Sequence, residues 1–193
     1  MRRQLDLFAR AVPSFDATFA ALRRTPLAEA AWIDHCPGWV SGHDALFDEL
    51  EQTLAWAAES RPMYDRVVEI PRLLARVPSV GIVDELRRAI SARYGEDFVR
   101  TTAALYRDGN DSVAWHGDTT ARDMPAATVA TVSLGAPRRF LLRPTAGGES
   151  IAFPAGRGDL IVMGGTCQRT YRHSIPKVAD AGPRIALMFR PIW

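Results

Sequence analysis

The spacing of apolar residues changes near residue 98, from a helical period before that point to short strand-like runs after it. Over residues 43–59 apolar residues recur every three or four positions, which predicts an amphipathic helix. They are Leu46, Phe47, Leu50, Leu54, Ala57 and Ala58. Ser41, followed three residues later by Asp44, is typical of a helix start.

A second amphipathic stretch follows, and Gly95 is expected to end it. Its apolar positions are Ile82, Val83, Leu86, Ile90 and Tyr94. The first third of the chain therefore reads as helices with connecting segments, and we expect these helices to lie against a larger element.

From residue 98 onward, short β-rich runs alternate with turn residues such as Gly, Asp, Asn and Pro. The expected strands are 101–106, 113–115, 128–134, 140–142, 151–153, 160–163, 171–175 and 184–189. About eight short strands in so short a segment predict a jelly roll or a barrel. The expected fold class is α+β, mostly β, with a double-stranded β-helix (jelly-roll) core and N-terminal buttressing helices.

The composition is typical of a soluble globular protein, with 47% apolar and 24% charged residues among 193. No apolar run is long enough to span a membrane and no export signal follows the N-terminus, so we expect a cytoplasmic protein without membrane contact. Cys36 and Cys167 lie far apart with no Cys-x-x-Cys spacing, which excludes a zinc finger and a disulfide scaffold.

The basic residues are all arginine except Lys177, and the formal net charge is only +2. Guanidinium groups suit phosphates and carboxylates, although a coding bias explains the arginine excess equally well. The charge therefore allows anionic partners without indicating them.

His116 and Asp118 form a His-x-Asp pair just after the candidate strand 113–115, and His173 lies in a later candidate strand. Residues i and i+2 of a strand point to the same side, so this imidazole and carboxylate can reach one ion. Two histidines and one carboxylate form the facial triad of non-haem Fe(II) oxygenases. The His-x-Asp pair alone is more often a turn or a surface hydrogen bond, so the triad depends on His173 lying nearby.

Arg184 and Arg190 lie an even number of residues apart in an otherwise apolar strand, so both guanidinium groups are expected on one face. A buried arginine requires an anion, and a dicarboxylate such as 2-oxoglutarate would supply a carboxylate for a bidentate pair. The alternative is that both arginines edge the sheet and pair with acidic side chains.

Several linked motifs, in this order, resemble the AlkB family of Fe(II)- and 2-oxoglutarate-dependent dioxygenases. They are Leu105-Tyr106-Arg107, residues 111–118, residues 132–135, Arg138-Arg139-Phe140, residues 158–165, residues 171–177, and the terminal Arg184 and Arg190. The resemblance covers residues 101–190 well and the first hundred residues loosely, through residues 37–39 and 68–73. It implies a single domain over 1–193, with 1–97 as helical buttress and substrate-lid segments and 98–193 as the catalytic jelly roll.

The resemblance implies that His116, Asp118 and His173 hold Fe(II). It also implies that Tyr106 and Arg184 grip the distal carboxylate of 2-oxoglutarate, that O2 is the second co-substrate, and that Arg190, near metal and substrate, takes part in catalysis.

The chain departs from the family at two positions. The family often has an asparagine two residues before the co-substrate tyrosine and another two residues after the first arginine, where this chain has Ala104 and Ala186. Each missing hydrogen bond is worth about 1 kcal/mol, so the affinity or orientation of the keto acid is expected to differ.

Candidate substrate contacts precede the metal strands. Tyr64 could stack on a base while Arg66 and Arg72 contact phosphates, although a sheet-edge strand with ordinary charge is at least as good an interpretation. Further arginines could add a basic rim, namely Arg138, Arg139, Arg143, Arg169 and Arg172.

Other chemically suggestive residues have ordinary interpretations. His35 and His43 are expected to be surface or packing residues, and Cys167 a small buried apolar residue. The tripeptide Arg157-Gly158-Asp159 is expected to open a strand rather than to serve adhesion.

The resemblance thus predicts oxidative dealkylation of N-alkylated DNA or RNA bases by a monomer, with release of formaldehyde, succinate and CO2. Two alternatives stay open: an iron- and 2-oxoglutarate-dependent hydroxylase or demethylase that acts on a protein or small molecule, and a non-catalytic nucleic-acid-binding module, for which the two alanines are the motive. A zinc hydrolase is disfavoured because no glutamate lies beside the His-x-Asp pair.

Overall fold

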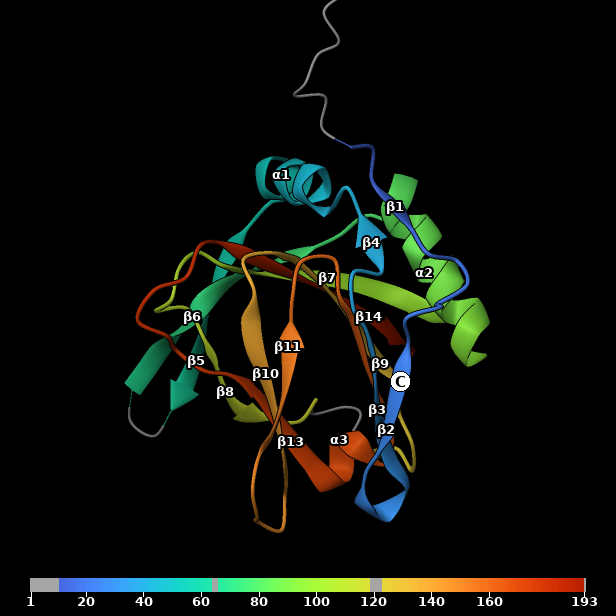
Figure 1. The fold of residues 1–193 in the computed structure, drawn as a ribbon. Helices are drawn as coiled ribbons and strands as arrows, with labels where there is room; N and C mark the ends of the chain where they lie inside the picture. The colour runs from blue at the N-terminus through green and yellow to red at the C-terminus, as the bar shows by residue number, and fades with distance from the viewer. Residues whose placement is uncertain (1–10, 64–65, 119–122, 193) are drawn as a thin grey trace, which may run out of the picture.

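Two antiparallel β-sheets face each other in the computed structural model (Figure 1). The structure describes residues 11–63, 66–118 and 123–192, and the side chains of all of these except 59–63 and 66–70. The larger sheet has eight strands, in the order β2 (Arg23–Pro26), β3 (Ala31–Cys36), β12 (Leu160–Gly165), β9 (Val129–Gly135), β14 (Arg184–Pro191), β7 (Phe98–Tyr106), β6 (Arg66–Arg76) and β5 (Ala57–Met63). The smaller sheet has four, in the order β11 (Ile151–Ala155), β10 (Arg138–Pro144), β13 (Tyr171–Ile175) and β8 (Val113–His116). A separate pair joins β1 (Ser14–Phe15) to β4 (Val40–Ser41).

From β7 onward the chain passes back and forth between the two sheets. Strands β7, β9, β12 and β14 belong to the larger sheet, whereas β8, β10, β11 and β13 belong to the smaller one. Only β10 and β11 follow each other within one sheet, as an antiparallel hairpin. This winding is a jelly roll, so the expected double-stranded β-helix core is confirmed, and its eight strands lie close to the predicted ranges.

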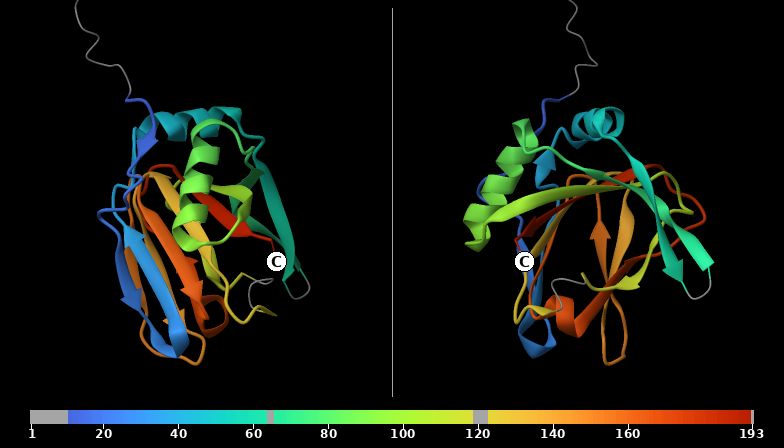
Figure 2. Two further views of the ribbon diagram at one scale, coloured as in Figure 1. Left: turned by 90° about the vertical axis from the view of Figure 1, so that its right-hand side faces the viewer. Right: turned by 180° about the vertical axis from the view of Figure 1, so that it is seen from behind.

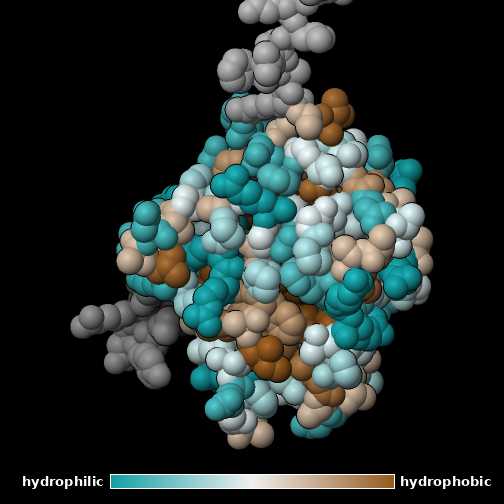
Figure 3. Space-filling model, in the orientation of Figure 1, coloured by the Kyte–Doolittle hydropathy of each residue, from teal (hydrophilic) through white to brown (hydrophobic). Residues whose placement is uncertain are grey.

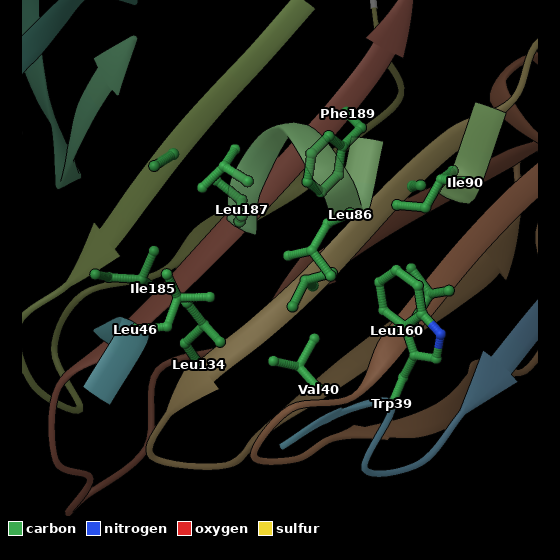
Figure 4. Close-up of a cluster of buried hydrophobic side chains, with 14 of the residues drawn as sticks. Trp39, Val40, Leu46, Leu86, Ile90, Leu134, Leu160, Ile185, Leu187 and Phe189 are labelled. Atoms are coloured by element: carbon green, nitrogen blue, oxygen red, sulfur yellow. The ribbon is translucent and has the colours of Figure 1, made fainter. Parts of the chain in front are cut away.

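Strand β14 shows why the larger sheet is apolar on both sides. Its neighbours are β9 and β7, so it lies inside the sheet. Ile185, Leu187 and Phe189 pack towards the helices on the outer face (Figure 4), while Ala186 faces the space between the sheets. A strand buried on both faces reads as a continuous apolar run rather than an alternating one.

Two helices cover the outer face of the larger sheet (Figure 2), as the periodicity predicts. Helix α1 (His43–Thr53) and helix α2 (Gly81–Tyr94) bury their apolar stripes in the same cluster as β14. Gly95 ends α2 in the left-handed region, at φ 67°, as expected. No helix in the described part of the chain is long and apolar enough to cross a bilayer.

The predicted helix over residues 43–59 is too long. Helix α1 ends at Thr53, whose hydroxyl donates to the Glu49 carbonyl, and Leu54 turns to extended backbone. The Trp56 indole N–H donates to the Glu51 carbonyl at 3.0 Å and so covers the helix end. Strand β5 begins at residue 57, which the local apolar spacing did not reveal.

The start of that helix also differs from the prediction, because Ser41 belongs to β4 and the N-cap is Gly42, without a side-chain hydrogen bond. More broadly, the prediction that residues 1–97 are mainly helical is wrong. The described part of that segment contains strands β1 to β6, and four of them extend the larger sheet. Long-range pairing with β7 and β12 decides their conformation.

Candidate metal and co-substrate site

His116 on β8 and His173 on β13 are direct cross-strand partners. Their ring centroids lie 4.2 Å apart. Asp118 follows β8, and one ligand atom from each of these three residues lies within 4.8 Å of the others. The structure therefore brings together the three side chains that the sequence proposed as metal ligands.

Both histidines are prepared to act as neutral ligands. The Nδ1–H of His116 donates to the Ala114 carbonyl at 2.8 Å, because a carbonyl can only accept, and this leaves Nε2 with its lone pair. His173 packs against the Phe140 ring, with centroids 5.4 Å apart. Burial lowers the pKa of His173 to about 3, and burial also lowers the pKa of His116.

Asp118 is held as an anion by its surroundings. Burial alone would raise its pKa, but the surrounding groups, chiefly the Arg190 guanidinium, together outweigh burial and the pKa lies below its usual value. Nε of Arg190 donates to Oδ2 of Asp118 at 2.7 Å. The backbone N–H of Asp118 donates to Oε1 of the buried Gln168 at 3.0 Å, so the segment after β8 is anchored as well.

Arg190 and Arg184 lie on the same face of β14, as their spacing predicts. The second contact of Arg190 is Nη1 to the Thr102 hydroxyl at 3.0 Å. In this arrangement Arg190 positions a metal ligand, while the catalytic role that the resemblance implies for it stays a prediction.

Arg184 is almost completely buried, with 1% of its surface exposed, and no carboxylate among the described residues pairs with it. Nε donates to the Ser133 hydroxyl at 2.9 Å, whereas Nη1 is buried without any partner. Burial lowers the pKa of the guanidinium. A buried, unpaired charge is strongly destabilising, so this arrangement indicates a site for an anion.

Tyr106 stands beside Arg184 in the buried interior. The two residues are cross-strand partners on β7 and β14, and the guanidinium carbon of Arg184 lies 5.1 Å from the centre of the Tyr106 ring. The Tyr106 hydroxyl accepts from Nη1 of Arg72 at 3.1 Å. Since arginine cannot accept a hydrogen bond, the hydroxyl proton stays available for an anion.

Arg72, on β6, therefore lies in the interior, next to the predicted co-substrate tyrosine. Its Nε is buried without a partner, like Nη1 of Arg184. The proposed contact with substrate phosphates stays a prediction. Of the other two proposed substrate residues, Tyr64 lies outside the described residues and so does the side chain of Arg66.

Arg138 does not belong to a basic rim, and that prediction is wrong. Only 4% of its surface is exposed. It donates to the carbonyls of Asp108, Asp111 and Pro176 at 3.1, 2.9 and 2.6 Å. Arg138 thereby joins the loop that leads into β8 to the loop that leaves β13, the two metal-bearing strands.

Several supporting residues of the site were not predicted from the sequence. Gln168, Thr102, Ser133 and Phe140 contact the predicted ligands or arginines but received no role. Even spacing along β7 was the available signal for Thr102, four residues before Tyr106. Gln168 lies in a four-residue helix, α3 (Cys167–Thr170), that the local sequence does not predict.

The residues with ordinary interpretations behave as expected. His35 contacts Asp159 at 2.9 Å and His43 contacts Asp44, both away from the triad. Cys167 is buried, which raises the pKa of its thiol to about 12 and leaves it inert at neutral pH. Asp159 precedes β12 and binds the backbone N–H groups of Gly38 and Gly156.

Residues 34–190 match the model of a family described as the 2OG-Fe(II) oxygenase superfamily. The chain is 27% identical over 186 residues to alpha-ketoglutarate-dependent dioxygenase alkB homolog 3 of Bos taurus, which covers 82% of this chain and 65% of that protein. It is 28% identical over 190 residues to DNA oxidative demethylase ALKBH2 of Arabidopsis thaliana, which covers 75% of this chain and 60% of that protein.

The fold is also similar to a solved structure described as OsALKBH1. The TM-score is 0.58 at 13% identity, over 83% of this chain and 96% of that one. At this identity the likeness concerns the fold. The chain spans less than two thirds of the length of the two curated relatives above.

Proposed function

The chain belongs to the 2OG-Fe(II) oxygenase superfamily and, within it, to the AlkB family, and we therefore propose that it removes alkyl groups from nucleic-acid bases by oxidation. The observation that carries the proposal is the cluster of His116, Asp118 and His173 beside a buried arginine that lacks an anion. The names of the relatives, a dioxygenase and a DNA oxidative demethylase, support the same class of substrate.

The residues of the site fit the groups that this family uses. Two neutral imidazoles and one carboxylate are the donor set of non-haem Fe(II) oxygenases, and they leave coordination positions free. The partnerless Nη1 of Arg184 and the Tyr106 hydroxyl suit the distal carboxylate of 2-oxoglutarate. Bound together, Fe(II), 2-oxoglutarate and O2 supply the oxidation of an N-alkyl carbon, with succinate and CO2 as by-products.

The contribution of the protein is positioning and charge. His116 and His173 stay neutral at physiological pH because burial lowers their pKa values, so no proton has to leave before they bind a metal ion. Arg190 holds the carboxylate of Asp118 ionised and fixes one of its oxygens. Arg184 and Tyr106 orient 2-oxoglutarate by holding its distal carboxylate, the end away from the metal.

A methyl group on a ring nitrogen has no easy path to hydrolysis, which favours oxidation. Hydroxylation of the methyl carbon gives a hemiaminal, and this breaks down to formaldehyde and the unmodified base. In a duplex the target base has to leave the stack, which is easiest where pairing is already impaired. We therefore expect lesions on the Watson–Crick edge to be preferred.

The test is incubation of the iron-loaded protein with 2-oxoglutarate and an oligonucleotide that carries 1-methyladenine or 3-methylcytosine. We expect release of formaldehyde together with loss of the methyl group, measured by mass spectrometry of the oligonucleotide. The H173A and H116A variants should lose both the metal and the activity, whereas H43A, a change at a histidine outside the site, should keep both.

Two results would contradict the proposal. Consumption of 2-oxoglutarate above the H116A level without formaldehyde from either oligonucleotide would indicate a protein or small-molecule substrate. Oligonucleotide binding with consumption of 2-oxoglutarate no higher than in H116A would indicate a non-catalytic binding module.

A further inference from the structure

The outer face of the smaller sheet carries arginines without acidic partners. Strands β8, β10, β11 and β13 contain four arginines and no aspartate or glutamate. Arg138 is buried in the interior, whereas Arg139 and Arg172 are exposed and Arg143 is half-buried. None of these last three forms an ion pair with a carboxylate of the described residues. We call Arg139, Arg143, Arg172 and Trp115 the outer basic face.

Two of these arginines are held close together. Arg143 on β10 and Arg172 on β13 are direct cross-strand partners. Like charges in this position destabilise a sheet, and no described carboxylate relieves the repulsion. An external anion would relieve it, so the pair indicates a binding surface rather than a structural contact.

Trp115 connects this surface to the metal site. It precedes His116 on β8, and successive strand residues point to opposite faces, so the imidazole faces the interior while the indole lies on the outer face. The guanidinium carbon of Arg143 lies 4.2 Å from the centre of the Trp115 ring, a cation–π contact that holds the arginine in place. Strand β8 is the edge of its sheet, so a bound chain can pass over this edge from the outer face to the triad.

The spacing of the arginines on the outer basic face fits a single phosphate backbone. Arg139 and Arg143 share β10, Arg172 lies on the adjacent β13, and neighbouring strands are only about 4.8 Å apart. Figure 3 views the molecule from this side, where hydrophilic side chains flank a smaller hydrophobic area. A narrow basic track beside an aromatic ring is typical of surfaces that bind single-stranded nucleic acid.

We propose that the outer basic face binds the phosphate backbone of a single-stranded nucleic acid whose target base enters the site on the other side of β8. This inference rests on the proposed function, since it assumes a nucleic-acid substrate. It assigns Arg139, Arg143 and Arg172 to backbone contacts that position the strand without reading its sequence.

The experiment measures binding of a fluorescently labelled, unmodified single-stranded oligonucleotide to the full chain at several salt concentrations. Each of R139Q, R143Q and R172Q should lower the slope of log affinity against log salt by about 0.7, and the triple variant should lower it by about 2. The matched control is R157Q, which removes an exposed arginine in the turn after β11 and should leave the slope unchanged. R143K, which keeps the charge, should keep the slope.

A triple variant that folds with normal circular dichroism and binds with the slope and affinity of the wild type would overturn the proposal. The proposal would also be overturned if the triple variant lost binding to polyglutamate but still bound the oligonucleotide like the wild type, because the surface would then recognise an acidic peptide. A different result would contradict the proposed function, namely the absence of formaldehyde release by the wild type. That result does not depend on how the affinity for the oligonucleotide varies with salt.

Discussion

Ala104 on β7 and Ala186 on β14 lie directly opposite each other, two pairs along the ladder from Tyr106 and Arg184 and so on the same face. Both alanines are buried between the sheets. The two positions at which the chain departs from its family are therefore a single site, next to the predicted anion pocket. Their effects on 2-oxoglutarate binding should be coupled rather than independent.

We predict that A186N strengthens the binding of 2-oxoglutarate. An added carboxamide can donate to the ligand, and a hydrogen bond to a charged acceptor contributes about 1.5–3 kcal/mol, so the gain should be roughly tenfold or more. Calorimetry on the Mn(II)-loaded protein in the absence of O2 measures it. Weaker binding together with a lower melting temperature would show instead that the space beside Ala104 is filled.

The sequence predicted the jelly roll and two of the three metal ligands from local patterns. Turn residues separate the strands after residue 98, and His116 and Asp118 share a short motif. The register that places His173 opposite His116 is not local, and only the resemblance indicated it. Even spacing alone was enough to place Arg184 and Arg190 on one face.

The predictions that were wrong concern features that depend on contacts between distant segments of the chain. Strand β5 begins just after α1, where helical spacing continues to Ala57 and Ala58, and its conformation is set by β6. Arg138 looked like a surface residue beside Arg139, because charge alone does not show which of two neighbours faces the interior. Its acceptors are backbone carbonyls from two remote loops.

The R184K variant should bind 2-oxoglutarate at least about tenfold more weakly, since a point charge replaces a fork that can bind a carboxylate with two nitrogens. S133A should weaken binding less, because it removes only the hydroxyl that orients Nε of Arg184. The same Mn(II) calorimetry compares them. Unchanged affinity in R184K would mean that the keto acid pairs with another cation.

Acid should destabilise the metal-free protein through His173. Its pKa lies near 3 in the folded state and near 6.5 when unfolded, so between these values the unfolded chain binds the extra proton. The free energy of unfolding therefore falls as pH drops below about 6.5, by up to about 1.4 kcal/mol per pH unit. Urea titrations near pH 7 and pH 5 measure this slope.

The matched variant for this prediction is H173L, which replaces the imidazole with an apolar side chain that cannot titrate. Its stability should decline less steeply with acid than that of the wild type. Parallel curves for the two proteins would assign the acid sensitivity to other groups, with His116 as the next candidate.

R190Q should weaken metal binding by about tenfold or more, as expected when a partner of a metal ligand is lost. Without Arg190, burial raises the pKa of Asp118 and the carboxylate takes up a proton at higher pH. Metal affinity measured across pH should thus fall off at a higher pH than in the wild type. T102V, which removes only the hydroxyl that accepts from Nη1 of Arg190, should change the metal affinity little.

Arg138 gives the sharpest test of how the scaffold supports the triad. R138M leaves the carbonyls of Asp108, Asp111 and Pro176 without their donor, and we expect the free energy of unfolding to fall by about 3 kcal/mol. R139M, one residue along β10 on the exposed face, should change it by less than about 0.5 kcal/mol. Urea unfolding compares the two variants. Because the hydrogen bonds of Arg138 fix the loops next to β8 and β13, metal affinity should also fall in R138M and not in R139M. Equal stability of the two variants would show that these loops keep their conformation without Arg138.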